Sequence, residues 1–174
     1  MRSLVTSVTV LAFLVLASTL GATKPSCAGT IINTCGKFSF WVPDDWKVTK
    51  EGNDSVERTS VESKDGTLSV LVGPLPDKTA VLTDEDVTDF VDEEFDDMKV
   101  TADKRDMVEK FNVRLLEGTG TDEGEAIVFK MLALDAGVDG GVLAVVISGE
   151  PKDLGRAENQ ATIEKILRSV RPQQ

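Results

Sequence analysis

Acidic side chains are concentrated in one short stretch of the sequence. Nine of them fall between positions 84 and 97: Asp84, Glu85, Asp86, Asp89, Asp92, Glu93, Glu94, Asp96 and Asp97. Carboxylates can hold a divalent cation or attract a basic protein. The stretch lacks the loop spacing and turn glycine of a calcium hand, and a rigid helix cannot wrap its side chains around one ion. A solvated outer face, a docking surface for a basic partner and a loose cation site remain open as interpretations.

The docking interpretation also draws on two tryptophans that flank a proline turn, Trp41 and Trp46. An exposed indole can form a recognition surface, although tryptophan at strand ends is more often buried. We expect burial for Trp46 more than for Trp41. A partner would then contact Trp41 and four of the acids, namely Asp89, Asp92, Glu93 and Asp96.

The two cysteines, Cys27 and Cys35, offer a different chemistry. In an oxidising compartment they could pair, and a ring this small would stabilise the fold by roughly 2 to 3 kcal/mol. The alternative is two unpaired thiols near a frayed terminus. Two soft ligands are too few for structural zinc, so we expect no metal-binding residue.

Catalytic machinery is scarce in this sequence. It contains no histidine and no tyrosine, which excludes Ser-His-Asp and Cys-His designs. The glycine-rich segments 118–120 and 137–141 do not match a phosphate-binding loop and are typical of turns. We expect no catalytic residue and no cofactor. The alternative enzyme would be a hydrolase or lyase built on carboxylates, for which the sequence places no pair.

An apolar run from Leu4 to Leu20 follows a single charge at Arg2 and predicts an export signal. Cleavage is expected after Ala22, with Ala28 as the alternative, and an uncleaved anchor is the competing fate. Lipid attachment at Cys27 is disfavoured, because Lys24-Pro25-Ser26 does not fit that processing. We therefore expect a periplasmic or secreted protein with no stable membrane insertion after cleavage. Residues 1–22 would be the signal, 23–35 an N-terminal extension and 36–174 one domain.

The charge balance narrows the range of partners. Removing residues 1–22 leaves 18 basic and 30 acidic residues, a net charge of −12. Nucleic-acid binding requires clustered lysine and arginine, and the longest such cluster is Lys104-Arg105. We expect no nucleic-acid contact and a protein partner, with a basic surface as one option.

Hydrophobic periodicity predicts strands followed by a helix, then three strands, then a second helix. Strands are expected at 36–43, 46–48, 107–118, 125–134 and 142–148, and residues 56–62 and 67–72 should form a hairpin through Asp65-Gly66. Helices are expected at 83–98, with Phe90 and Phe95 buried, and at 153–171. The 142–148 strand is apolar on both faces and should be central in the sheet.

This order of elements fits an α+β fold, an antiparallel β-sheet covered by helices, rather than a parallel sheet. The segment from Phe38 to Trp46, together with Ile166–Val170 in the last helix, resembles the PsbP-like and DcrB-like superfamily of exported proteins. The resemblance implies an α/β/α sandwich and a small non-enzymatic binding or accessory role in the cell envelope. It assigns no catalytic or ligand residue.

Overall fold

The computed structural model describes residues 28–35, 37–52, 57–75, 89–91, 95–108, 111–137 and 141–173. Its elements, in chain order, are β1 (Gly29–Thr34), β2 (Phe38–Pro43), β3 (Lys47–Glu51), β4 (Arg58–Glu62), β5 (Leu68–Leu75), β6 (Asp96–Val108), β7 (Phe111–Asp122), β8 (Glu125–Asp135), β9 (Val142–Gly149), α2 (Pro151–Leu154), α3 (Ala157–Ser169) and β10 (Arg171–Pro172). Residues 89–91 are also helical. No helix among these residues has the length and apolar character needed to span a bilayer.

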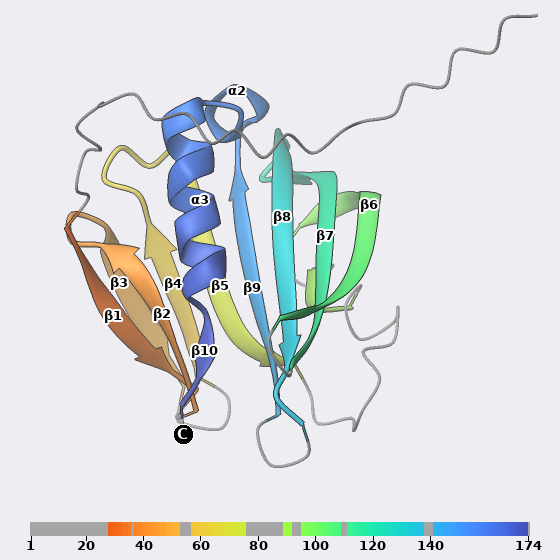
Figure 1. Ribbon diagram of the computed structural model, residues 1–174. Helices are drawn as coiled ribbons and strands as arrows, with labels where there is room; N and C mark the ends of the chain where they lie inside the picture. The colour runs from red at the N-terminus through yellow and green to blue at the C-terminus, as the bar shows by residue number, and fades with distance from the viewer. Residues whose placement is uncertain are drawn as a thin grey trace, which may run out of the picture.

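Two antiparallel sheets make up most of the molecule. The larger has the order β3-β4-β5-β9-β8-β7-β6, and the smaller has the order β1-β2-β10. Helix α3 and the small sheet lie on the same side of the large sheet, with α2 at one end (Figure 1). The α+β class and the antiparallel sheet are as predicted. A helical layer over the opposite face stays a prediction, because only residues 89–91 are described as helical there.

The turns follow from local chemistry. Gly66 has a φ of +71° in the β4–β5 hairpin, and Asp65 accepts hydrogen bonds from the hydroxyls of Ser63 and Thr67. Glu123 and Gly124 both have positive φ, 49° and 85°, as the two-residue turn between β7 and β8 requires. The first hairpin was predicted from the sequence. The predicted strand at 125–134 matches β8, whereas the one at 107–118 is wrong at its start, because β6 ends at Val108 and β7 begins at Phe111.

The large sheet buries side chains on both faces. One set, which we call the helix-side core, joins Val145 and Ile147 of β9 to Ile163 and Ile166 of α3. The other, the far-side core, contains Phe129, Met131, Val146 and residues 90 and 91. Strand β9 is the fourth of seven, so the prediction of a central strand with buried Val145 and Ile147 is confirmed.

The predicted helix over residues 83–98 is wrong at its C-terminal end. Residues 89–91 are helical, but Asp96 begins the long strand β6, while residues 83–88 and 92–94 lie outside the described residues. Phe90 is buried, as predicted, whereas Phe95 is half-buried and stacks on Phe129 with ring centroids 6.1 Å apart. Strand β6 was missed because register shifts at Asp96/Lys99 and Val100/Ala102 interrupt its alternation.

The chain ends differ from prediction in two further ways. The C-terminal helix is divided into α2 and α3, since Gly155 ends the first and Arg156 has extended backbone angles. At the other end, β1 pairs with β2 from Gly29 to Thr34. The folded part therefore includes most of the segment expected to be an extension, and the predicted cleavage site lies outside the described residues.

Candidate functional site

Cys35 lies in a polar cluster that joins the two sheets. Its thiol donates a hydrogen bond to the carbonyl of Glu57 (3.3 Å), and its backbone N–H donates to the Glu57 carboxylate (3.1 Å). Lys50 binds the same carboxylate at 2.9 Å, and the buried hydroxyls of Thr34 and Thr59 are 2.8 Å apart. Burial, reinforced by the Glu57 charge, raises the pKa of the Cys35 thiol. A protonated thiol is a poor nucleophile, so this cluster is a structural link between sheets.

Whether Cys27 and Cys35 pair, which the sequence left open, stays a prediction. Cys27 lies outside the described residues, and Cys35 is a free buried thiol. The carbonyl of Ala28 accepts a hydrogen bond from Asp44, so it continues the line of β1. At about 3.3 Å per strand residue, Ala28 and Thr34 are roughly 20 Å apart. Strand β1 thus carries Cys35 well away from Ala28.

The four acids expected to bind a partner do not share one helix face. Asp89 is exposed on the helical residues whose neighbours Phe90 and Val91 belong to the far-side core. Asp96 is exposed at the start of β6. Asp92 and Glu93 lie outside the described residues. Since Asp96 is on a strand, the docking surface predicted from a continuous helix is not present in that form.

Trp41 is buried rather than presented to solvent, with 7% of its surface exposed. The Lys165 ammonium lies over the Trp41 ring, 3.4 Å from its centroid, and the Trp41 backbone N–H donates a hydrogen bond to the hydroxyl of Ser169 at 2.7 Å. A side chain at Gly29 would collide with the indole. Trp46 is the half-buried tryptophan, so the expected ranking of the two is reversed.

The buried ionisable side chains are held in ion pairs. Arg114 binds both oxygens of Asp103, at 3.0 and 2.7 Å, and this bonding holds the pKa of the Asp103 carboxyl below its ordinary value. Asp153 pairs with Arg156 at 2.6 Å. Within the described ranges no group of three or more cysteine, aspartate or glutamate side chains converges as a metal site would require.

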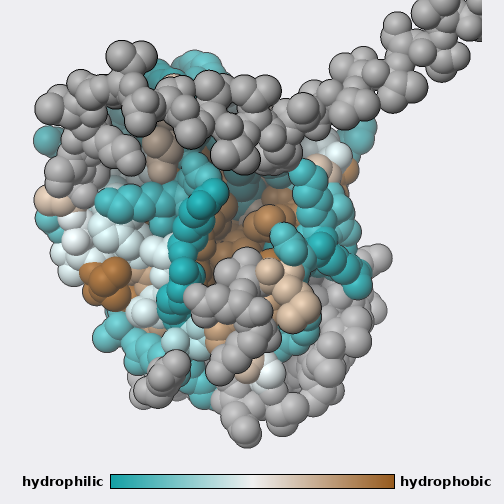
Figure 2. Space-filling view, viewed as in Figure 1, coloured by the Kyte–Doolittle hydropathy of each residue, from teal (hydrophilic) through white to brown (hydrophobic). Residues whose placement is uncertain are grey.

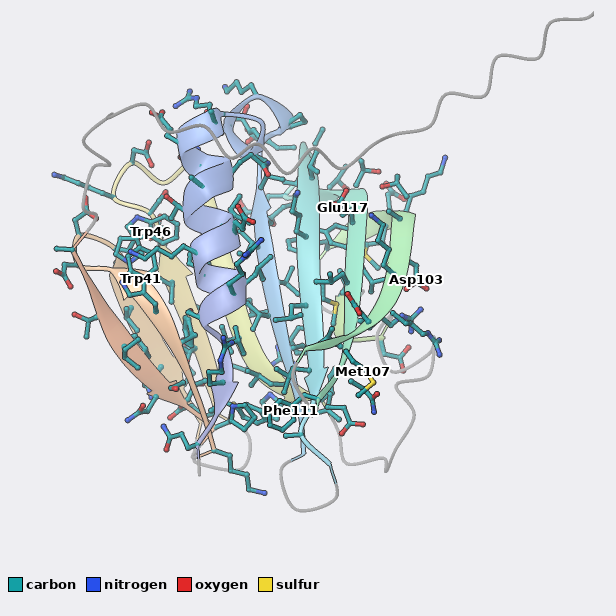
Figure 3. The ribbon with its side chains drawn as sticks, viewed as in Figure 1. Trp41, Trp46, Asp103, Met107, Phe111 and Glu117 are labelled. Atoms are coloured by element: carbon teal, nitrogen blue, oxygen red, sulfur yellow. The ribbon has the colours of Figure 1, made fainter. Side chains whose placement is uncertain are left out.

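An apolar depression lies beside α3 on the helix-side face of the large sheet (Figure 2). Three half-buried side chains of β7 and β8 pack against the helix-side core here, namely Phe111, Leu115 and Val128. We call this surface the β7–β8 hollow and define it by these residues. Figure 3 shows Phe111 at the lower end of β7 and the two tryptophans on the opposite side of α3.

A polar bridge crosses the hollow from strand to helix. Lys130 on β8 binds Glu117 on β7 at 3.2 Å and donates to the side-chain carbonyl of Gln160 on α3 at 3.3 Å. Glu117 and Lys130 are directly opposed in the β7–β8 ladder, and Leu115 and Leu132 form the next pair on the same face. An apolar surface next to a satisfied polar bridge is typical of a recognition surface.

The other side of α3 carries an open pocket of about 430 Å³ lined by Ala161, Glu164, Lys165, Arg168 and Ser169. Arg168 and Glu164 pair at 2.6 Å, and both are exposed. The lining is mixed in charge and the pocket is shallow, which gives less surface for an apolar contact than the hollow does. Neither surface was predicted from the sequence. The alternating residues of β7 and β8 have the pattern of buried core residues, and the sequence does not show how much of these strands α3 covers.

No protein-family model matches the sequence, and the comparison with curated proteins finds no match. Solved structures do match. Cyanobacterial PsbP (CyanoP) from Synechocystis is 12% identical with a TM-score of 0.60, over 90% of this chain and 100% of that one. Mog1p, a Ran-binding protein of Saccharomyces cerevisiae, is 10% identical with a TM-score of 0.54, over 84% and 96% of the two chains.

LpqN of Mycobacterium tuberculosis, described as involved in cell envelope biogenesis, is 10% identical with a TM-score of 0.51, over 84% of this chain and 91% of that one. Identities this low establish shared architecture alone. The predicted resemblance in fold is confirmed over most of the chain, and the protein has a PsbP-like fold.

Proposed function

We propose that the protein is an exported, non-catalytic accessory module that binds a protein partner in the cell envelope through the β7–β8 hollow. The apolar run at residues 4–20, predicted to be an export signal, supports the location. The proposal for binding rests on the hollow, where Phe111, Leu115 and Val128 remain partly open to solvent beside α3. Apolar surface that stays partly open to solvent is often covered by another molecule.

The ionisable groups favour a binding role over catalysis. The buried charges of Arg114 and Asp153 are already paired, and the Cys35 thiol is held in its protonated form. The chain has no histidine to act as a general base near neutral pH. A carboxylate enzyme would need two acids converging on a cleft, whereas the surfaces beside α3 are an apolar hollow and an open pocket of mixed charge.

The fold is compatible with this role. Mog1p, which shares the architecture, is described as a Ran-binding protein, and LpqN as involved in cell envelope biogenesis. Folds of this kind serve as scaffolds on which different binding surfaces are placed. The partner must therefore be identified through this chain's own hollow.

Site-specific photocrosslinking in the native host tests the proposal. A photoreactive amino acid replaces Leu115 in the hollow, and the matched control places it at Val48 on β3, which is 37% exposed and distant from the hollow. We expect one discrete adduct with an envelope protein from position 115 and none from position 48. Both variants must keep the unfolding temperature of the unmodified protein.

Adducts of equal yield at both positions, or no adduct at position 115 in folded protein, would contradict the proposal. A hydrolytic activity in the purified protein that is lost when exposed acids are neutralised would favour the carboxylate enzyme instead.

A further inference from the structure

The edges of the two sheets differ in how they are protected. Among the described residues, β3 and β6 form the edges of the large sheet, and β1 and β10 those of the small one. Strand β3 carries Lys47 and Lys50, β6 is rich in charge and has two register shifts, and β10 is two residues long and contains Pro172. Charges, bulges, proline and short length all discourage strand addition. Strand β1, with the sequence Gly-Thr-Ile-Ile-Asn-Thr, has none of these features.

The hydrogen bonds show which backbone groups of β1 face outward. The carbonyl of Asn33 accepts a bond from Lys50 on β3, so Asn33 turns its polar groups away from β2. In an antiparallel pair such residues alternate, which places Gly29 and Ile31 in the same outward set. The facing residues agree, since Pro43 opposite Gly29 has no N–H and Trp41 opposite Ile31 donates to Ser169. The N–H and C=O groups of Gly29 and Ile31 therefore lie on the open edge.

The side chains of β1 add an apolar contact to these groups. Ile31 is 58% exposed, and β-branched side chains opposite one another stabilise paired strands. The two charges that contact β1 already have partners: Lys50 is held by the Asn33 carbonyl and the Glu57 carboxylate, and Asp44 accepts a hydrogen bond from the Thr30 hydroxyl. A charged residue on an incoming strand would have to compete with these contacts.

We propose that the outer edge of β1 from Gly29 to Asn33 binds an extended, uncharged segment of a partner protein by antiparallel or parallel strand addition. A β-branched or aromatic side chain of that segment lies beside Ile31. The edge is separate from the β7–β8 hollow, because β1 belongs to the small sheet on the other side of α3 (Figure 1). This inference does not depend on what the hollow binds.

A second copy of the chain is a poorer occupant of the same edge. A two-fold antiparallel pair centred on Ile31 would place Gly29 opposite Asn33 of the other copy. Each copy also carries a net charge of −11, which opposes association. An uncharged segment of another protein avoids this repulsion.

Amide hydrogen exchange of the full chain, followed by NMR, tests the proposal with a short synthetic peptide of alternating valine and threonine as the probe. Without the peptide, the outward N–H of Ile31 should exchange quickly and the inward N–H of Ile32 slowly. Saturating peptide should slow exchange at Ile31 by about tenfold or more. The peptide variant with glutamate in place of threonine should give no protection.

Two variants make the result specific. Ile31→Lys places a charge on the β1 edge, which discourages strand addition, and should weaken peptide binding about tenfold. The matched control Val48→Lys places the same charge on the β3 edge and should leave binding unchanged. The proposal fails if Ile31→Lys binds as well as wild type, if protection appears on β3 or β6 instead, or if Ile31 is already protected in a dimer detected by sedimentation.

Discussion

The ion pair between Asp103 and Arg114 makes one carboxylate responsible for part of the pH dependence of stability. Bonding to Arg114 lowers the pKa of Asp103 below its ordinary value of 3.8. A lowered pKa stabilises the fold above the unfolded-state value, and this contribution is lost as the pH falls through the folded-state value. The side chain of Arg114 is 6% exposed and that of Asp103 is 39% exposed, so solvent screens part of the interaction.

We expect Asp103→Asn to lower the free energy of unfolding at pH 7 by about 1 to 3 kcal/mol, because the buried guanidinium then faces a neutral amide. Urea unfolding at pH 7 and pH 3 measures this, and the gap between wild type and variant should narrow at pH 3. Asp106→Asn on the same strand is the control, with an expected change within about 0.5 kcal/mol. A gap that is equal at both pH values would show that the ion pair does not titrate as described.

The position of Cys35 in the fold makes its thiol unreactive. It is 7% exposed and hydrogen-bonded, and its pKa is raised by burial. We expect the native protein to react slowly with a thiol reagent at Cys35 and rapidly once unfolded. Peptide mapping after export decides whether Cys27 and Cys35 pair. Rapid modification of Cys35 in the folded protein would contradict this placement of the thiol.

The long β6–β7 hairpin depends on a glycine on β7 that lies between β6 and β8. A Cβ at Gly118 would lie 2.7 Å from the carbonyl oxygen of Lys99 and would also collide with the ring of Phe129. We expect Gly118→Ala to cost about 2 to 3 kcal/mol of unfolding free energy, measured by urea titration. In a Phe129→Leu background the additional cost should be smaller, because part of the collision is removed. Equal costs in both backgrounds would assign the effect to the contact with the Lys99 carbonyl rather than to the ring.

Elements with strong local signals could be predicted from the sequence. The 58–75 hairpin was found because Asp65-Gly66 forms a tight turn between alternating residues, and β9 because it is apolar on both faces. Strand β6 could not be found in the same way, since most of its side chains are exposed and its register shifts twice. The acids that precede it extend a helical pattern past the point where the strand begins.

The candidate site was less predictable than the fold, because it depends on how the layers cover one another. Leu115 and Val128 have the alternation of core residues, and only the position of α3 shows that they are partly open. Trp41 was expected to be more exposed than Trp46, but Lys165 on α3 closes over its ring. Contacts between distant parts of the chain decide both cases.

At the scale of the whole molecule, the two candidate surfaces lie on opposite faces of the large sheet. Asp89 adjoins residues of the far-side core, whereas the β7–β8 hollow opens on the helix-side face. The overall negative charge can speed the approach of a basic partner, but steering of this kind weakens with salt and does not define the contact. We therefore expect binding to depend on the hollow rather than on the acidic segment.

Capture of the crosslinked envelope protein by three variants tests this central claim most directly. Leu115→Asp places a charge in the hollow, Val48→Asp places it on β3 as a control, and a triple variant changes Asp89, Asp92 and Asp96 to Lys. At physiological salt we expect Leu115→Asp to lose about 90% or more of capture while remaining folded, since a buried unpaired charge in an interface costs several kcal/mol. Val48→Asp and the triple variant should retain capture. Undiminished capture by folded Leu115→Asp, together with loss in the triple variant, would contradict the account and assign the partner to the acidic segment.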